Sequence, residues 1–448
     1  MEILKKHKEI ALLLFVAFLI RFFLLPYGFH PDIIVNANWG EFIHRNGTVG
    51  FYESPIWETL TAPTQPPLVS LVYGWAYDVF EWGFVWILSY TTGVITNHNF
   101  YPELFSPLFS FYDWFVALYA ETPQKIGALI TLKLIPVISD LLLGLAIYVL
   151  ARKRMVAKKA LLFPTLYLIS PFSFYISALW GQYDQVTFLF ALFSFISIFH
   201  KRFVYASPLL LAISVALKPT SLIFVPIYLW LYFLQKPKFK TVILGGGIAA
   251  VVMSYTVYLF SEGSLFEFIN NVLIPNMFDK ADHRIVNNAF NFWKIFFGEK
   301  LASGNQVLLF LPAKVWGYVS FAIFNIAAFC IARKNTKKLE NTFYAMFIVS
   351  AGSFMFMTNM LERYFFAGIV CMLIASVFNT KLVKYWILAS FIFWINLYKE
   401  WWFPGFFDPL KQLLVAGDFL LVRVLALANT VIFAWATWLT LRPLTRNN

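Results

Sequence analysis

The sequence predicts an all-α, polytopic membrane protein with about twelve transmembrane helices and a large first extracytoplasmic loop. Hydrophobic residues make up 60% of the 448 residues and charged residues only 13%, whereas a soluble domain carries about 25% charged residues. Apolar windows of about 17–25 residues recur along the chain, each long enough to cross the bilayer as a helix. The apolar–polar alternation of a membrane β-barrel is absent from the sequence, so the spans are predicted to be helical.

The spanning helices are placed by these windows and by the short polar gaps between them. The first window follows a basic head but has no small-residue cleavage site after it, so we interpret it as an uncleaved span. An even number of crossings puts both termini and every basic cluster on the same side. The predicted spans are residues 9–26, 126–151, 160–178, 186–200, 203–218, 220–234, 241–260, 306–332, 342–358, 364–380, 384–398 and 413–440.

The net charge of +12 is distributed in a way that indicates membrane topology. Twenty-one of the 35 Lys and Arg residues lie in the gaps that this topology assigns to the cytoplasm, as the positive-inside rule requires. We therefore expect a membrane as the partner of these charges and no nucleic acid.

Residues 27–125 form the first extracytoplasmic loop of what we predict to be a single domain, residues 1–448. This loop is rich in Trp, Tyr, Phe and Pro and carries most of the acidic residues of the N-terminal half. Helices lying along the interface are expected here, where Trp and Tyr are favoured. The alternative is that residues 66–96 span the membrane, although Asp78 and Glu81 interrupt that stretch and a second crossing would then be needed.

The polar motifs of the chain fall at one face of the membrane once this topology is drawn. Ionisable groups near membrane depth are costly and therefore point to function. The motifs are "GFHPDIIVNANWGEF" (28–42), "WGQYDQ" (180–185), "LKPTS" (217–221), "FDKADHRIVNNAFNFW" (278–293), "NMLERYFF" (359–366) and "LYKEWWFPGFFD" (397–408).

Two carboxylates stand out, and each has a structural and a functional interpretation. Asp32 and Asn36 are four residues apart and would share a helix face after Pro31. Asp32 could accept a proton from an alcohol, or it could simply charge a helix N-terminus. Asp184 could bind a metal, a sugar hydroxyl or a proton, or it could cap the helix that follows.

Several basic residues at this face could bind a phosphate, which Arg can hold through two parallel hydrogen bonds. Lys218 could instead extend along the membrane interface, and Arg363 could pair with Glu362. Within the predicted spans, Arg21 could likewise bind a phosphate or have a structural role. Lys133 and Asp140 could pair with each other or bond neighbouring helices. The candidate phosphate ligands are Lys218, His283, Arg284 and Arg363.

The sequence has no phosphate-binding P-loop, no Gly-rich dinucleotide turn and no Cys/His cluster. We therefore predict no cofactor and no metal site, although paired outer carboxylates could still hold an ion.

These motifs, in their order, resemble the GT-C superfamily of membrane glycosyltransferases. The first helix ending in "RFFLLP", followed by "HPDIIVNANWGEF", resembles the start of such enzymes, and "TQPPLVSLVYGW" looks like an element of their first loop. The later elements "LKLIPVISDLLLGLAIYVL", "FYISALWGQYDQVTFLFALF", "ALKPTSLIFVPIYL", "NNAFNFW" and "NMLERYFF" are similar to bacterial and archaeal mannosyltransferase-like members. Some of those are similar to the enzyme that adds the second mannose in glycosylphosphatidylinositol synthesis and to lipid-linked-oligosaccharide transferases.

The resemblance implies an inverting transfer of a hexose, with mannose favoured, from a polyprenyl-phosphate or dolichyl-phosphate donor. The acceptor would be a hydroxyl of a lipid or glycan, and the site would face the extracytoplasmic or lumenal side of a cell or ER-type membrane. Asp32 falls on the family's loop base and Arg363 on a donor-phosphate contact. The implied sugar- or acceptor-binding residues are Asp184, Gln182, Tyr183, Asn36, Trp39 and Glu41.

The chain departs from the family pattern at Leu361, where a His commonly precedes Glu-Arg-Tyr. That departure puts the role of the His in doubt here, and His283 is the candidate to replace it. The alternative functions are a secondary transporter, which would place its site at mid-membrane with access to both sides, and a non-enzymatic lipid-binding subunit. Convergence of Asp32, Asp184 and Arg363 in one outer cavity would favour the transferase.

Overall fold

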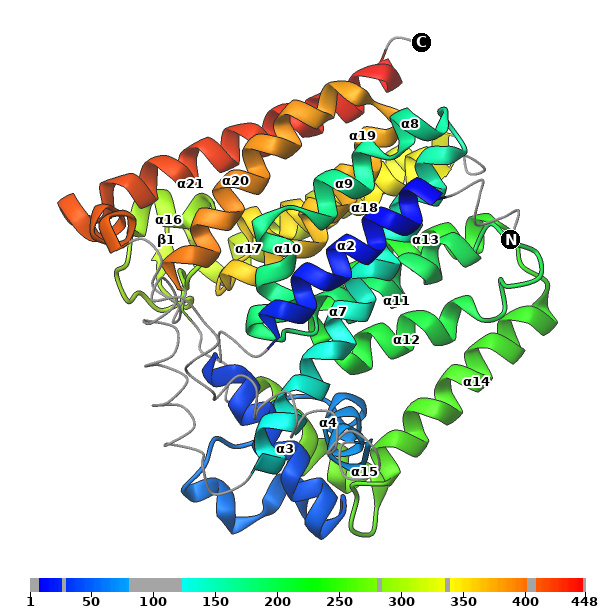
Figure 1. Ribbon diagram of the computed structural model, residues 1–448, viewed down its shortest axis with the longest axis vertical. Coiled ribbons are helices and arrows are strands. Elements are labelled where there is room, and N and C mark those ends of the chain that lie inside the picture. The colour runs from blue at the N-terminus through cyan, green and yellow to red at the C-terminus, as the bar shows by residue number, and fades with distance from the viewer. Residues whose placement is uncertain are drawn as a thin grey trace, which may run out of the picture.

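The computed structural model describes residues 8–25, 30–79, 123–279, 284–334, 339–400 and 408–445, and helices dominate it (Figure 1). Within these ranges the strands are confined to one short hairpin, β1 (Val307–Leu308) paired antiparallel with β2 (Leu311–Pro312). The predicted all-α class is confirmed. Most of the first loop beyond residue 79, and with it the question whether 66–96 spans the membrane, lies outside the described residues.

The N-terminal part of the chain contributes helices to both the bundle and a smaller lobe at one end. Its helices are α2 (Lys8–Leu24), α3 (Pro31–Asn46), α4 (Pro67–Val79), α7 (Pro123–Arg152), α8 (Ala157–Ala160), α9 (Leu162–Leu168), α10 (Pro171–Phe174), α11 (Asp184–Ser197), α12 (Ser207–Leu217), α13 (Val225–Leu234) and α14 (Phe239–Tyr258).

The C-terminal part completes the bundle. Its helices are α15 (Leu265–Phe268), α16 (Phe292–Phe297), α17 (Ala313–Lys334), α18 (Leu339–Phe356), α19 (Phe366–Phe378), α20 (Val383–Lys399) and α21 (Asp408–Thr445). Short 3-10 or π turns occupy residues 51–53, 55–58, 175–180, 219–224, 269–273, 275–279, 362–365 and 380–382.

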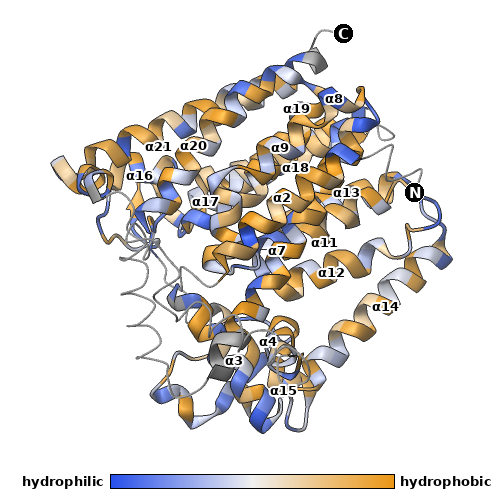
Figure 2. Cartoon of the chain, in the orientation of Figure 1, coloured by the Kyte–Doolittle hydropathy of each residue, from blue (hydrophilic) through white to orange (hydrophobic). Residues whose placement is uncertain are grey.

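The bundle has the surface of an integral membrane protein. α18 and α19 lie at its centre and are buried along almost their whole length, whereas the outer helices expose large apolar side chains such as Phe239, Val251 and Trp435. Hydrophobic residues run along these outer helices in Figure 2. Since a soluble monomer rarely exposes so large an apolar surface, this surface faces lipid.

Every predicted span coincides with helical structure, but the number of crossings stays a prediction. Four helices in the described ranges are long and apolar enough to cross a membrane: Leu129–Arg152, Phe239–Tyr258, Ala313–Lys334 and Pro409–Arg442. A fifth arises if Ala157–Leu168 and Pro171–Trp180, which meet at a 50° bend, count as one span. Pro171 causes this bend, because it forces Ser170 into an extended conformation (ψ 132°).

Two predicted boundaries were wrong. The span expected to begin at residue 306 begins at Ala313, because residues 307–312 form the β1–β2 hairpin and Pro312 closes it just before the helix. The single span expected at 413–440 belongs to α21, which is interrupted at residues 416–419, where Gly417, Asp418 and Phe419 adopt positive φ.

A lobe formed by α3 and α4 lies at one end of the bundle, beside the start of α7 and next to α15 (Figure 1). These helices approach closely at Gly40, where a Cβ atom would lie 2.6 Å from the carbonyl oxygen of Tyr73. The described part of the first loop therefore contains two helices packed on each other and on the end of the bundle.

A buried ion pair fastens α2 to the bundle. Arg21 Nε lies 3.0 Å from Asp140 Oδ2 of α7, and Arg21 Nη2 donates to Ser173 Oγ at 2.8 Å. The Tyr167 hydroxyl donates to the other carboxylate oxygen, and Lys133 Nζ donates to the carbonyl of Leu25 at 3.0 Å. Asp140 and Lys133 thus bond neighbouring segments rather than each other.

We predict that Asp140→Leu lowers the free energy of unfolding by about 3–5 kcal/mol, because it leaves the Arg21 charge buried without its partner. The double variant Arg21→Met/Asp140→Leu should cost less than Asp140→Leu alone, because neither charge remains. Thermal unfolding in detergent compares the three proteins, and equal losses in the single and double variants would contradict a pairing role.

Candidate functional site

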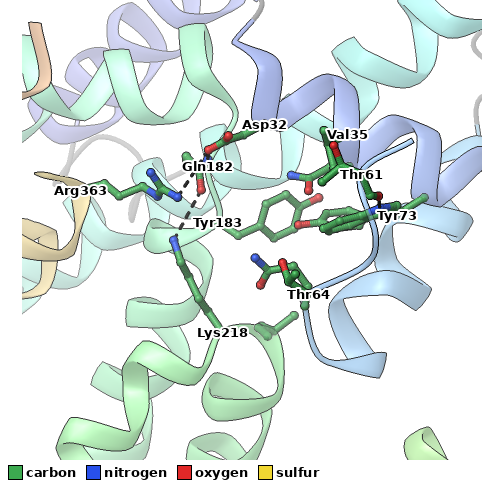
Figure 3. A pocket seen from close by; sticks show the side chains of 13 residues that line it. Asp32, Val35, Thr61, Thr64, Tyr73, Gln182, Tyr183, Lys218 and Arg363 are labelled. Carbon is green, nitrogen blue, oxygen red and sulfur yellow. Dashed lines mark hydrogen bonds and ion pairs between the residues drawn. The ribbon is translucent and has the colours of Figure 1, made fainter. Parts of the chain in front are cut away.

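A cavity of about 170 Å³ lies where the α3–α4 lobe meets the end of the bundle. Its walls come from α3, α4, the turn before α11, the end of α12 and the turn before α19, so distant parts of the sequence converge on it (Figure 3). The lining residues are Asp32, Val35, Asn36, Trp39, Thr61, Thr64, Gln65, Tyr73, Gln182, Tyr183, Leu217, Lys218 and Arg363.

Asp32 enters the cavity from the first turn of α3. Pro31 occupies the first helical position, and the helix is capped by His30, whose Nδ1 accepts a hydrogen bond from the Asp32 backbone N–H at 3.1 Å. Asp32 is therefore not the capping residue, although its charge suits a helix N-terminus. Its side chain keeps 35% of its surface exposed, so the carboxylate is available to a ligand.

The Asp32 carboxylate is held by groups from two other segments. Gln182 Nε2 donates to Asp32 Oδ2 at 2.7 Å, and Arg363 Nη2 lies 3.5 Å from the same oxygen. Burial alone would raise the pKa of Asp32, but the charges of Arg363 foremost, then of His30 once acid has protonated it, and of Lys218 hold that pKa below its ordinary value of 3.8. The carboxylate is consequently ionised at neutral pH.

Arg363 reaches the cavity from the 3-10 turn Glu362–Phe365 that precedes α19. Its guanidinium carbon lies 5.0 Å from the ring centre of Trp180, and its Nη1 donates to the buried carboxylate of Glu362 at 3.0 Å. An aromatic face and two carboxylates therefore fix the guanidinium while one edge stays on the cavity.

His30 packs on Trp180 as well, with ring centres 4.3 Å apart. Burial is the main cause that lowers the pKa of His30 to about 4; the charge of Asp32 opposes this shift and that of Arg363 adds to it. His30 is thus neutral at neutral pH, in keeping with the hydrogen bond that its Nδ1 accepts.

The turn at Gly181 brings Gln182 next to Asp32. Residues Tyr175–Trp180 form a π-helical turn that ends at Gly181, which has φ +76°. A Cβ atom at this position would lie 2.8 Å from Lys133 Cγ and 3.0 Å from Ile33 Cδ1. Only glycine meets both constraints without strain, and the polar interruption in "WGQYDQ" is therefore a tight turn that faces the cavity.

Lys218 lines the cavity from the end of α12. Pro219 favours an extended conformation at Lys218 (φ −158°, ψ 123°), which ends α12 there. Lys218 Nζ lies 2.7 Å from Asp184 Oδ2 and donates to Gln182 Oε1 at 3.5 Å. Gln182 consequently bridges the two residues: its amide oxygen accepts from Lys218, and its amide nitrogen donates to Asp32.

Seven of the predicted site residues line this one cavity, three lie elsewhere, and one lies outside the described residues. Asp184 opens a helix whose N-cap is Tyr183 and lines an adjoining cavity of about 30 Å³. Glu41 pairs with Arg45 at 2.8 Å, Arg284 lines a separate cavity, and His283 lies outside the described residues. The seven are Asp32, Asn36, Trp39, Gln182, Tyr183, Lys218 and Arg363.

Sequence reasoning missed the segment that covers the cavity. Thr61, Thr64 and Gln65 line the cavity. Two hydrogen bonds hold this segment in place. Trp39 Nε1 donates to the Thr61 carbonyl at 2.9 Å, and the Tyr52 hydroxyl donates to the Gln65 carbonyl at 2.7 Å. The Pro-rich stretch "TAPTQPP" overlaps the element "TQPPLVSLVYGW", which was noted for its resemblance but was not predicted to line the site.

Trp180, His30 and Tyr73 were also missed. Each lies within a motif that the sequence analysis quoted, but nothing in the sequence distinguishes its aromatic side chain from that of a core residue. Tyr73 stands edge-on to Tyr183 with ring centres 5.2 Å apart, so aromatic rings and hydroxyls form the side of the cavity away from Arg363 (Figure 3).

This arrangement combines an ionised carboxylate, two cations and a wall of aromatic and amide groups. The cations could hold an anion, the carboxylate could accept a proton, and the aromatic wall could bind a sugar face. Among the described residues, no three His, Cys, Asp or Glu side chains are grouped to hold a metal ion.

A comparison with protein-family models gives a match for the middle of the chain. Residues 111–358 match the model of glycosyltransferase family 87, a region that covers more than half of the 448 residues. It includes Gln182 and Lys218, whereas Asp32 and Arg363 lie before and after it. No curated protein matches the chain.

We predict that Gly181→Ala lowers the thermal stability of the protein and distorts the site. Gly263→Ala is the matched control, because Gly263 also has positive φ (+84°) but a Cβ atom added there would meet nothing within 4 Å. The left-handed conformation costs about 1–2 kcal/mol in both variants, so the additional loss at position 181 measures the steric conflict. Equal melting temperatures for the two variants would contradict the close approach.

Proposed function

The chain belongs to glycosyltransferase family 87, and we propose that it moves a hexose, preferably mannose, from a polyprenyl-phosphate-linked donor to a hydroxyl of a lipid or glycan acceptor. The observation that carries this proposal is the pairing of Asp32 with Arg363, 3.5 Å apart on the wall of one cavity. A proton acceptor and an anion ligand are thus held side by side, as transfer from a sugar phosphate requires.

Asp32 is the proposed general base. The acceptor oxygen attacks the anomeric carbon of the donor sugar while its proton passes to the carboxylate of Asp32. The bond from the anomeric carbon to the phosphate oxygen breaks on the opposite face, so the configuration inverts. The hydrogen bond from Gln182 orients the carboxylate for this step.

Arg363 and Lys218 are the proposed ligands of the donor phosphate. The leaving group is a lipid phosphate, whose negative charge grows as the bond to the sugar breaks. Cations placed beforehand stabilise that charge without having to reorganise. Both side chains line the cavity, and Lys218 is linked through Gln182 to Asp32, which pairs with Arg363, so one phosphate can lie between the two cations.

The remaining lining residues suit a sugar. Trp39, Tyr73 and Tyr183 offer aromatic faces, and Asn36 and Gln65 offer amide groups that can bond hydroxyls. Asp184 acts in this scheme by holding Lys218 in place.

The distribution of basic residues supports an extracytoplasmic site. α7 runs from the lobe beside the cavity to Arg152, and α14 runs from Lys238 and Lys240 towards the lobe. The basic ends of both helices therefore lie away from the cavity, and the positive-inside rule assigns such ends to the cytoplasm.

The position of the cavity favours the transferase over a secondary transporter. Its charged residues lie at the ends of α3, α12 and α19 rather than at the middle of a span, whereas a transporter places its site near mid-membrane.

We expect Asp32→Asn to lower kcat for hexose transfer by about 10²–10⁴-fold, because the amide cannot accept the proton. The measurement is transfer of radiolabelled hexose from polyprenyl-phosphate mannose, and separately glucose, to membrane lipids, with and without chelator. Asp78→Asn is the control, since Asp78 lies in the same lobe but is exposed and bonded to His44.

The results separate the parts of the proposal. Transfer lost in Asp32→Asn and retained in Asp78→Asn, with or without chelator, supports a metal-independent base. Full activity in Asp32→Asn would overturn the assignment of the base, and wild-type protein that uses neither donor would overturn the assignment of the donor.

The pH dependence of transfer should report the Asp32–Arg363 contact. Because the pKa of Asp32 is held below 3.8, the acid limb of kcat/KM in the wild type should lie below about pH 4. In Arg363→Gln the attraction is lost and burial dominates, so the pKa of Asp32 rises and the acid limb should move to higher pH.

Arg363→Lys is the matched variant, because it keeps the charge but loses the bidentate geometry. It should be slower than wild type with an acid limb close to that of the wild type. An acid limb that stays unchanged in Arg363→Gln would show that another group limits the reaction at low pH.

A further inference from the structure

A second cavity, of about 150 Å³, lies where the loop before α17 meets the end of α18. The described residues that line it include two cations, Arg284 and Lys314, and no acidic side chain. The full lining is Arg284, Gly304, Lys314, Gly317, Tyr318, Met357, Thr358 and Asn359. A cavity of this composition favours an anion.

The placement of Lys314 strengthens this inference. It lies in the first turn of α17, where the helix dipole disfavours a positive charge and favours a negative one. The first amides of this helix are already bonded, since Ala313 N donates to the Gln306 carbonyl at 2.9 Å and Lys314 N to the Gly304 carbonyl at 3.0 Å. A bound anion would offset both the Lys314 charge and the dipole.

Backbone hydrogen bonds hold the walls of the cavity together. Ile285 N donates to the Ala302 carbonyl at 2.7 Å, and Asn359 N donates to the Ile285 carbonyl at 3.2 Å. The segments that carry Arg284 and Asn359 are thereby joined.

An apolar hairpin next to the cavity indicates the source of the anion. The tip of β1–β2 exposes Leu309 and Phe310, which retain 90% and 72% of their surface. Trp316 braces the tip, because its Nε1 donates to the Leu308 carbonyl at 3.0 Å and its ring lies 5.0 Å from that of Phe310. Exposed aromatic and aliphatic side chains at the end of a candidate membrane span are suited to the lipid interface.

We propose that this second cavity binds the phosphate of an anionic membrane phospholipid, with Arg284 and Lys314 on the phosphate and the hairpin tip against the acyl chains. The site differs from the donor-phosphate site, because Arg363 and Lys218 line the first cavity and neither lines the second. Residues 357–359 line the second cavity and Arg363 follows four residues later, so the lipid occupies a wall next to the reaction site.

The test measures lipid binding rather than transfer, so its outcome does not depend on the proposed reaction. Purified protein in neutral detergent is titrated with phosphatidylglycerol, with phosphatidylcholine or with inorganic phosphate, and the apparent affinity is obtained from the rise in melting temperature and by native mass spectrometry. Wild type should bind phosphatidylglycerol more tightly than phosphatidylcholine. Lys314→Gln should weaken phosphatidylglycerol binding about tenfold, and Arg284→Gln/Lys314→Gln should weaken it further.

Lys300→Gln is the matched control, because Lys300 is an exposed lysine of the same loop that does not line the cavity. It should bind phosphatidylglycerol as the wild type does. Because Lys314 is itself exposed, its single variant should fold even if the double variant does not. Equal affinity in wild type and Lys314→Gln would overturn the proposal, and so would a site that takes inorganic phosphate but not phosphatidylglycerol.

Discussion

The contact between Asp32 and Arg363 joins the two parts of the chain on which the site depends. Asp32 belongs to the lobe that follows the first helix, and Arg363 belongs to the turn that enters the central helix α19. Charged groups in a largely apolar surrounding are stable only when they are paired and hydrogen-bonded. Here Gln182, Glu362 and Trp180 complete the pairing, so the lobe and the bundle meet in one defined arrangement.

A second set of polar contacts holds the end of α18, several residues before Arg363. Asn291 Nδ2 donates to the Phe354 carbonyl at 3.1 Å, and Trp293 Nε1 donates to the Phe356 carbonyl at 2.8 Å. Asn396 bonds both the Phe290 amide and the Asn288 carbonyl. The motif "NNAFNFW" therefore fixes the segment that leads to Arg363, which explains why so many amides lie together in this loop.

Sequence patterns predicted the features that depend on local composition, such as the position of a helix. They failed for features that depend on contacts between distant segments, such as which residues share a cavity. Every apolar window coincides with helical structure, whereas helices outside the windows, such as α16, were not located by them. The Asp32–Asn36 spacing predicted a shared helix face, and both residues lie on α3. The hairpin before α17 was missed because "VLLFLP" is apolar enough to resemble the start of a span. Arg284 was grouped with Arg363 because the predicted topology puts both residues on the same side of the membrane. Backbone pairing of residues 284–285 with residues 302–303 and 359 instead places Arg284 at the second cavity.

The same geometry gives Arg363 two competing ligands in the proposed reaction. Without a donor, its guanidinium attracts the Asp32 carboxylate and helps to keep the pKa of that group low, which makes Asp32 a weak base. A donor phosphate at Arg363 would neutralise most of that attraction, and burial would then raise the pKa of Asp32. Proton acceptance would thus become easier only once the leaving group is in place. An acceptor hydroxyl that enters the cavity without a donor would meet a carboxylate that Arg363 still holds, so the charge arrangement itself favours donor binding before acceptor activation.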